Sequence, residues 1–129
     1  MTLKKGYKAL LDEALAQVET VSIETAIAAH GNPDVVFVDL RDPRELEREG
    51  IIPGAFHAPR GMIEFWVDPE SPYHKPIFAS GRRFLLFCAA GWRSALTAKS
   101  LEDMGLEKVA HIDGGFSAWK SMGGPVAGK

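Results

Sequence analysis

The stretch F-L-L-F-C-A-A-G-W-R-S, residues 84–94, combines a strand, a short loop and the start of a helix. Its first four residues are apolar without interruption, which is typical of a strand covered on both faces. Cys88 ends this strand, and an apolar stripe at helical spacing predicts a helix from about Arg93 to Met104. A strand that turns directly into a helix is the repeating unit of parallel α/β sheets.

The rest of the chain repeats this alternation. Val35–Val38 is a second apolar run that ends at Asp39, and Val109–Ile112 is a third. Cap residues and apolar spacing predict further helices over Leu3–Val18, from Ser22 to about Gly31, from Asp42 to Gly50, over Met62–Val67, and from Gly115 to Met122. The sequence therefore predicts an α/β fold with a central parallel sheet flanked by helices.

The expected organisation is an N-terminal helix within residues 1–19 and one domain over residues 20–125. The sequence leaves open whether the first helix packs on this domain or on a second copy. Residues 60–81 contain Pro69, Pro72 and Pro76 and are predicted to form a structured loop after a short helix.

Composition excludes several classes of protein. The 129 residues include 15 Lys and Arg against 17 Asp and Glu, a net charge of −2, which argues against a nucleic-acid-binding protein. No apolar run approaches the length of a membrane span, and the first residues contain no continuous apolar segment of a secretory signal. With a single cysteine, the chain cannot form an internal disulfide, and we expect a cytoplasmic protein.

No metal or other cofactor is predicted. One cysteine cannot form a cysteine-rich zinc site, and the histidines lie without metal-ligand spacing at His30, His57, His74 and His111. We therefore assign none of the four histidines a catalytic role from the sequence.

Cys88 stands where its thiol can react. Thiols react as thiolates, and a helix N-terminus lowers the pKa of a thiol and binds anions through its free N–H groups. Gly91 gives the loop the backbone freedom that a tight cradle requires, and Ala89 and Ala90 keep the cradle narrow. Arg93 either clamps an anionic substrate or holds the loop by pairing with a carboxylate. This combination predicts a nucleophilic cysteine in an anion cradle.

Five motifs together give the chain a resemblance to the rhodanese (sulfurtransferase) domains. They follow in order as V-D-L-R-D-P-R-E-L (38–46), I-P-G-A (52–55), C-A-A-G-W-R-S (88–94), D-G-G-F-S-A-W (113–119) and G-G-P-V (123–126). The resemblance covers about residues 20–124 and leaves the N-terminal helix outside. Ile51 stands where the family often has histidine, and the loop contains one cation, Arg93.

The resemblance implies a thiosulfate sulfurtransferase-like enzyme. Cys88 would take a sulfane sulfur from a small donor such as thiosulfate and pass it, as a persulfide, to cyanide, a thiol or a protein acceptor. The residues implied to bind the substrate are Ala89, Ala90, Gly91, Trp92, Arg93 and Ser94. The alternative is a persulfide carrier or protein-interaction domain with little turnover, which a partner would recognise through Trp92, Trp66 and Tyr73.

The length of the cysteine loop distinguishes a sulfurtransferase from a third candidate class, the phosphatases. Four residues lie between Cys88 and Arg93, so the loop has six members. Related phosphatases and arsenate reductases are similar but use seven members, which admits a larger tetrahedral oxyanion. Phosphatase activity is therefore disfavoured.

The remaining charged and aromatic residues have structural interpretations. Asp39 and Arg41 are expected to pair and brace the end of their strand, and Glu45 to complete its helix cap. Trp119 is expected to pack the last helix onto the core. Trp92 faces the loop entrance or packs on the loop rim.

Overall fold

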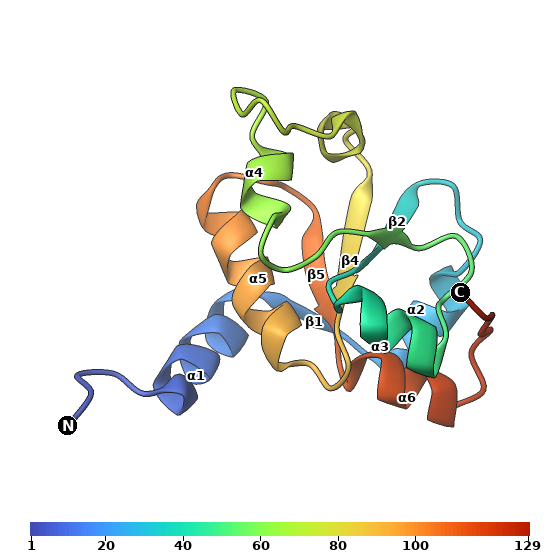
Figure 1. Ribbon diagram of the computed structural model, residues 1–129, viewed down its shortest axis with the longest axis horizontal. Coiled ribbons are helices and arrows are strands. Elements are labelled where there is room, and N and C mark those ends of the chain that lie inside the picture. Colours follow the sequence, from blue (N-terminus) through green and yellow to red (C-terminus); the bar gives the residue numbers. More distant parts are fainter.

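A computed structural model describes all residues 1–129 (Figure 1). Six α-helices and one short 3-10 helix surround a sheet of five strands. The helices are α1 (Tyr7–Gln17), α2 (Ile23–Ala29), α3 (Pro43–Glu49), α4 (Ile63–Val67), η1 (Pro76–Ala79), α5 (Trp92–Asp103) and α6 (Gly115–Ser121). The strands are β1 (Glu19–Val21), β2 (Val35–Asp39), β3 (Phe56–His57), β4 (Arg83–Phe87) and β5 (Val109–Ile112).

The sheet is parallel throughout, in the order β1-β5-β4-β2-β3. All strand carboxyl ends therefore lie at one edge, where ligands bind in sheets of this kind. β4 lies in the centre of the sheet, so Cys88 directly follows the middle strand at that edge. The predicted α/β fold with a central parallel sheet is confirmed.

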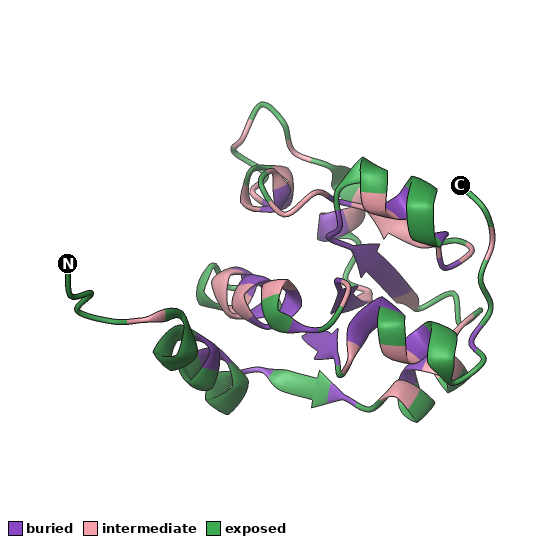
Figure 2. Ribbon diagram, turned by 60° about the horizontal axis from the view of Figure 1, so that its bottom comes forward, coloured by how far each residue is buried: buried purple, intermediate pink, exposed green.

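Alternation along the strands separates two apolar layers. One face carries Leu86 and Cys88 and is covered by residues of α4, η1 and α5. The other face carries Leu85 and Phe87 and is covered by α2 and α6. The buried residues follow this division, with exposed positions on the outer helix faces (Figure 2).

Helix α1 packs on α5 of the same chain. Leu11 and Ala14 are buried against Ala95, which resolves the open question of where the N-terminal helix packs. Other apolar residues on the predicted stripe of α1, among them Tyr7 and Leu15, stay exposed. The helix is also shorter than the predicted Leu3–Val18.

Two strands and the 3-10 helix are absent from the sequence-based prediction. β1 has three residues and buries only Val21, and β3 has two residues, so neither shows a readable alternation. No helix is both long enough and apolar enough to span a membrane.

Candidate active site

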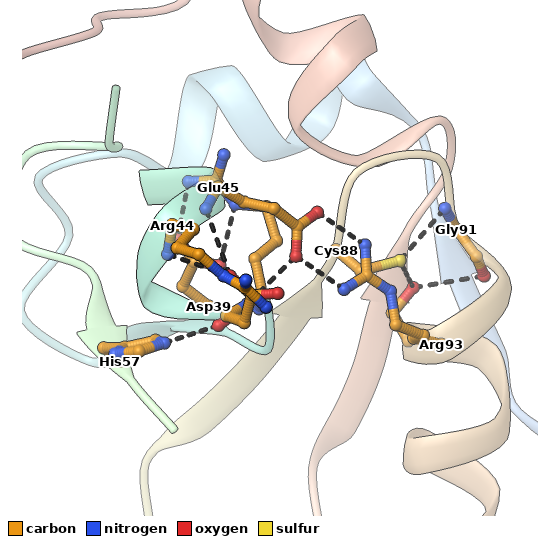
Figure 3. Close-up of polar contacts among 10 residues, drawn as sticks. Asp39, Arg44, Glu45, His57, Cys88, Gly91 and Arg93 are labelled. Carbon is orange, nitrogen blue, oxygen red and sulfur yellow. Dashed lines mark hydrogen bonds and ion pairs between the residues drawn. The ribbon is translucent and has the colours of Figure 1, made fainter. Parts of the chain in front are cut away.

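Cys88 lies at the end of β4 with its side chain buried (Figure 3). The N–H of Gly91 donates a hydrogen bond to Cys88 Sγ over 3.2 Å. Gly91 is the N-cap of α5 and has a φ of +117°, a left-handed conformation that favours glycine. The loop thus curls back over its own sulfur and places the N-terminus of a 12-residue helix beside it. This is the predicted strand–loop–helix arrangement.

Helix α6 fixes the first half of the loop through its backbone. The N–H groups of Phe116 and Ser117 donate to the carbonyl oxygens of Cys88 and Ala89, over 2.8 and 3.0 Å. A Cβ at Gly115 would lie 2.3 Å from the Cys88 carbonyl oxygen, so this approach requires glycine. The D-G-G motif at residues 113–115 therefore supports the cysteine loop directly.

Arg93 is paired with a carboxylate. Its guanidinium donates to both oxygens of Glu45, over 2.8 and 2.9 Å, which joins the end of the loop to α3 (Figure 3). These hydrogen bonds lower the pKa of Glu45 to about 2 and raise the pKa of Arg93. Of the two roles left open for Arg93, the structure shows the pairing that holds the loop. Sequence spacing could not reveal this partner, because the two residues are 48 positions apart.

Glu45 also performs its predicted role in the helix cap. The Asp42 side chain accepts from the N–H groups of Arg44 and Glu45, and Glu45 accepts from the N–H of Asp42. One carboxylate therefore fixes both the start of α3 and the arginine of the cysteine loop.

Asp39 and Arg41 form the predicted ion pair. Two hydrogen bonds of 3.0 and 2.8 Å join the side chains, both almost fully buried, and Arg41 also donates to the Gly50 carbonyl. The Arg41 guanidinium lies 4.0 Å from the centre of the Phe116 ring. The pair braces the end of β2 beside the loop through Arg41 Nε and Nη2.

The other predicted loop residues divide by exposure. Ala90 and Trp92 are exposed and Ala89 is half-buried, so they lie at the mouth of the loop. Trp92 contacts the Tyr7 ring of α1, with ring centres 5.2 Å apart, while 61% of it stays exposed. Ser94 is fully buried and lies behind Cys88 rather than at the mouth.

Ser94 connects the loop to a histidine that the sequence analysis left without a role. Its hydroxyl lies 3.1 Å from His111 Nδ1 and 3.7 Å from Cys88 Sγ. His111 is 2% exposed, and burial lowers its pKa against the attraction of Asp113. The signal that could have located it is strand register, because His111 pairs with Leu86, two residues before Cys88.

A cleft of about 240 Å³ opens beside Ala89 and is lined by charges of both signs. Its walls come from α3 and α6 and the residues next to them, namely Arg41, Glu45, Arg48, Glu49, Phe116, Ser117 and Lys120. Lys120 makes no ion pair and donates only to the Glu49 carbonyl, over 3.4 Å. No cluster of three acidic, histidine or cysteine side chains that could hold a metal ion is present.

Comparison with known proteins places this geometry in a family context. The chain matches the family model of the rhodanese-like domain over residues 22–122. A protein of unknown function from Rhodopseudomonas palustris, described as a possible tyrosine phosphatase, is 56% identical, with 98% of each chain covered and a TM-score of 0.96. The polysulfide-sulfur transferase of Wolinella succinogenes is 27% identical, with 95% of this chain and 88% of that chain covered and a TM-score of 0.71. Thiosulfate sulfurtransferase from Pseudomonas aeruginosa shares the fold at 20% identity and a TM-score of 0.71, over 87% of this chain and 20% of that one.

Proposed function

The chain belongs to the rhodanese-like family, and we propose that it is a sulfurtransferase that carries a sulfane sulfur on Cys88. The observation that carries the proposal is the Gly91 N–H donating to Cys88 Sγ inside a six-membered loop. A donor hydrogen bond to sulfur stabilises the thiolate and, after transfer, a persulfide anion in the same cradle.

Transfer would proceed in two displacements. The Cys88 thiolate attacks the outer sulfur of thiosulfate; a bond forms between the two sulfurs, the S–S bond of the donor breaks, and its electron pair leaves on sulfite. A thiolate or cyanide then attacks the outer sulfur of the persulfide, and the electron pair of the broken S–S bond returns to Cys88 Sγ. Neither step requires a metal or a redox cofactor.

The donor we favour is a small sulfane-sulfur anion, either thiosulfate or polysulfide. Support for an anion comes from the cleft beside Ala89, where Lys120 lies without an ion pair. Support for polysulfide comes from the similarity to the Wolinella protein named for that donor. Because Cys88 is the only cysteine, an acceptor from outside the chain must remove the sulfur.

The alternative is a persulfide carrier that turns over slowly and delivers sulfur to a protein. Trp92 favours it, since a large aromatic side chain at the loop mouth, 61% exposed, is suited to contact a partner surface. Rapid multiple turnover with small thiols would support the enzyme, and stoichiometric transfer to one protein would support the carrier.

Phosphatase activity is the reading suggested by the description of the Rhodopseudomonas protein. The six-membered loop argues against it, and Arg93, the only cation of the loop, is already bound to Glu45. Cys88-dependent hydrolysis of p-nitrophenyl phosphate would overturn this conclusion.

The test of sulfur transfer is an intact-mass measurement. The reduced protein is incubated with thiosulfate or polysulfide and desalted, and its intact mass is then measured. The Cys88→Ser variant is treated in the same way as the matched control. We expect the wild-type protein alone to gain one sulfur atom and to lose it on addition of cyanide, with release of thiocyanate. A folded wild-type protein with a reactive thiol that gains no sulfur from either donor would refute the small-donor enzyme and leave the carrier.

A further inference from the structure

A line of polar contacts runs from the Cys88 sulfur through the interior to the surface at the edge strand β1. Cys88 Sγ lies 3.7 Å from Ser94 Oγ, which lies 3.1 Å from His111 Nδ1, and His111 Nε2 lies 3.0 Å from Thr20 Oγ1. The first three residues are each 2% exposed or less, whereas Thr20 is exposed. The line therefore has one end at the nucleophile and the other in solvent.

Sheet register builds this line. His111 of β5 pairs with Leu86 of β4 on one side and with Thr20 of β1 on the other. His111 thus stands between the central strand that leads to Cys88 and the edge strand. The first turn of α5 then places the Ser94 hydroxyl between the sulfur and the imidazole.

We propose that Ser94, His111 and Thr20 form a proton path through which the buried Cys88 thiol is deprotonated. The proton leaves through Thr20 rather than through the loop mouth. The Cys88 S–H bond breaks and its proton passes to Ser94 Oγ, while the Ser94 hydroxyl proton passes to His111 Nδ1. The proton on His111 Nε2 passes to Thr20 Oγ1, and Thr20 releases its own hydroxyl proton to water. One proton leaves Cys88 and one reaches solvent, so the sulfur gains a negative charge and the path stays neutral.

The states before and after this proton transfer differ in the tautomer of His111. Before it, Cys88 donates to Ser94, the Ser94 hydroxyl is shared between His111 Nδ1 and the Gly91 carbonyl oxygen 3.2 Å away, and Nε2–H donates to Thr20. Afterwards every hydrogen bond points the other way, and Ser94 donates to the thiolate. Burial lowers the pKa of His111, which keeps the imidazole neutral in both arrangements. His111 acts through Ser94 and is therefore a positioning residue.

Charged residues lie near both Cys88 and His111. Arg93, on the same loop, attracts the Cys88 thiolate and is itself paired with Glu45. Asp113 faces His111 and attracts a proton toward the imidazole. Cys88 is only 1% exposed, and a bound donor would cover the loop mouth, where water would otherwise accept the proton. A proton path that ends at Thr20 therefore allows deprotonation while the donor is bound.

The decisive test reads the tautomer directly and does not depend on sulfur transfer. Nitrogen-15 NMR of the histidine rings is followed while thiolate formation is measured by ultraviolet absorbance. We expect the His111 ring proton on Nε2 while Cys88 is a thiol and on Nδ1 once it is a thiolate. The Cys88→Ala variant should keep one tautomer over the same pH range. A tautomer that stays fixed while the thiolate forms, or that changes equally in the Cys88→Ala protein, would overturn the proposal.

A second test breaks the path at its exposed end. Thr20→Val keeps the size of the side chain but removes the hydroxyl, and Thr20→Ser is the matched control that retains it. We expect Thr20→Val to slow both iodoacetamide alkylation of Cys88 and sulfur loading about fivefold at neutral pH, the equivalent of about one net hydrogen bond. Thr20→Ser should match the wild type. Equal rates for the Val variant and the wild type would overturn the proposal. Slower alkylation in a protein that never loads sulfur would instead refute only the proposed function.

Discussion

Replacing Glu45 with glutamine separates the two roles of this carboxylate. Glutamine can still accept the Asp42 N–H hydrogen bond, so the cap of α3 remains, but it cannot form the charged pair with Arg93. The difference between the ordinary Glu pKa of 4.5 and about 2 corresponds to an upper limit of about 3 kcal/mol. Because 40% of the Arg93 side chain is exposed, solvent screens the pair, and we expect a loss of about 1–2 kcal/mol at pH 7.

The pH dependence of this loss follows from the sign of the pKa shift. A carboxylate with a lowered folded-state pKa stabilises the protein fully above about pH 4.5 and loses its contribution as the pH falls through about 2. The difference between wild type and Glu45→Gln should therefore shrink to less than half its pH 7 value at pH 3, by the same linkage.

The assay is urea unfolding at pH 7 and pH 3, with midpoints compared at equal slopes. Glu47→Gln is the control, because Glu47 lies on the same helix and its side chain is 68% exposed, 3.9 Å from Lys129. We expect this control to change stability by less than about 0.5 kcal/mol. An equal loss for Glu45→Gln at both pH values, or none at pH 7, would refute the view that the charge pair holds the loop.

Three further substitutions test the surroundings of the loop by urea unfolding. Gly115→Ala should lower the free energy of unfolding by about 2–4 kcal/mol, because its Cβ would meet the Cys88 carbonyl. The control Gly123→Ala, which lies in open space, should lower it by only about 1 kcal/mol. Similar losses for the two variants would contradict the close approach at Gly115. Arg41→Met should cost about 3–5 kcal/mol, because Asp39 would remain buried without its partner, and a neutral result would show that the pair is dispensable. Trp92→Ala should lower the free energy of unfolding by about 1 kcal/mol, because the aromatic contact with Tyr7 is lost. The same variant should slow sulfur transfer to a protein acceptor more than sulfur transfer to cyanide. Equal slowing with both acceptors would argue against docking of a partner at the loop mouth.

The sequence predicts the parts of this fold whose signals are local. The apolar runs that became β2, β4 and β5, and the cap of α3, are read from neighbouring residues. The edge strand β1 is missed because two of its three residues are exposed, so its backbone pairing with β5 leaves no apolar pattern. Helix α1 is predicted too long because its apolar stripe is only partly covered by α5.

The candidate site likewise contains residues that local sequence patterns predict and residues that they do not. The cysteine loop is contiguous, so its glycine and arginine could be identified from spacing alone. The partner of Arg93 lies 48 residues away, and His111 reaches Ser94 only through strand register. Contacts of this kind depend on how the sheet is assembled, which no local pattern encodes.

The backbone contacts from α6 have a consequence for redesign of the loop. Because Phe116 and Ser117 hold the carbonyls of Cys88 and Ala89, the first two loop positions are fixed relative to a separate helix. An inserted residue there would shift both carbonyls out of register and lose two hydrogen bonds. Ala90 is exposed, so an insertion at that position could bulge into solvent and leave the anchors in place. An engineered seven-membered loop that admits bulkier oxyanions should therefore be sought by insertion after Ala90.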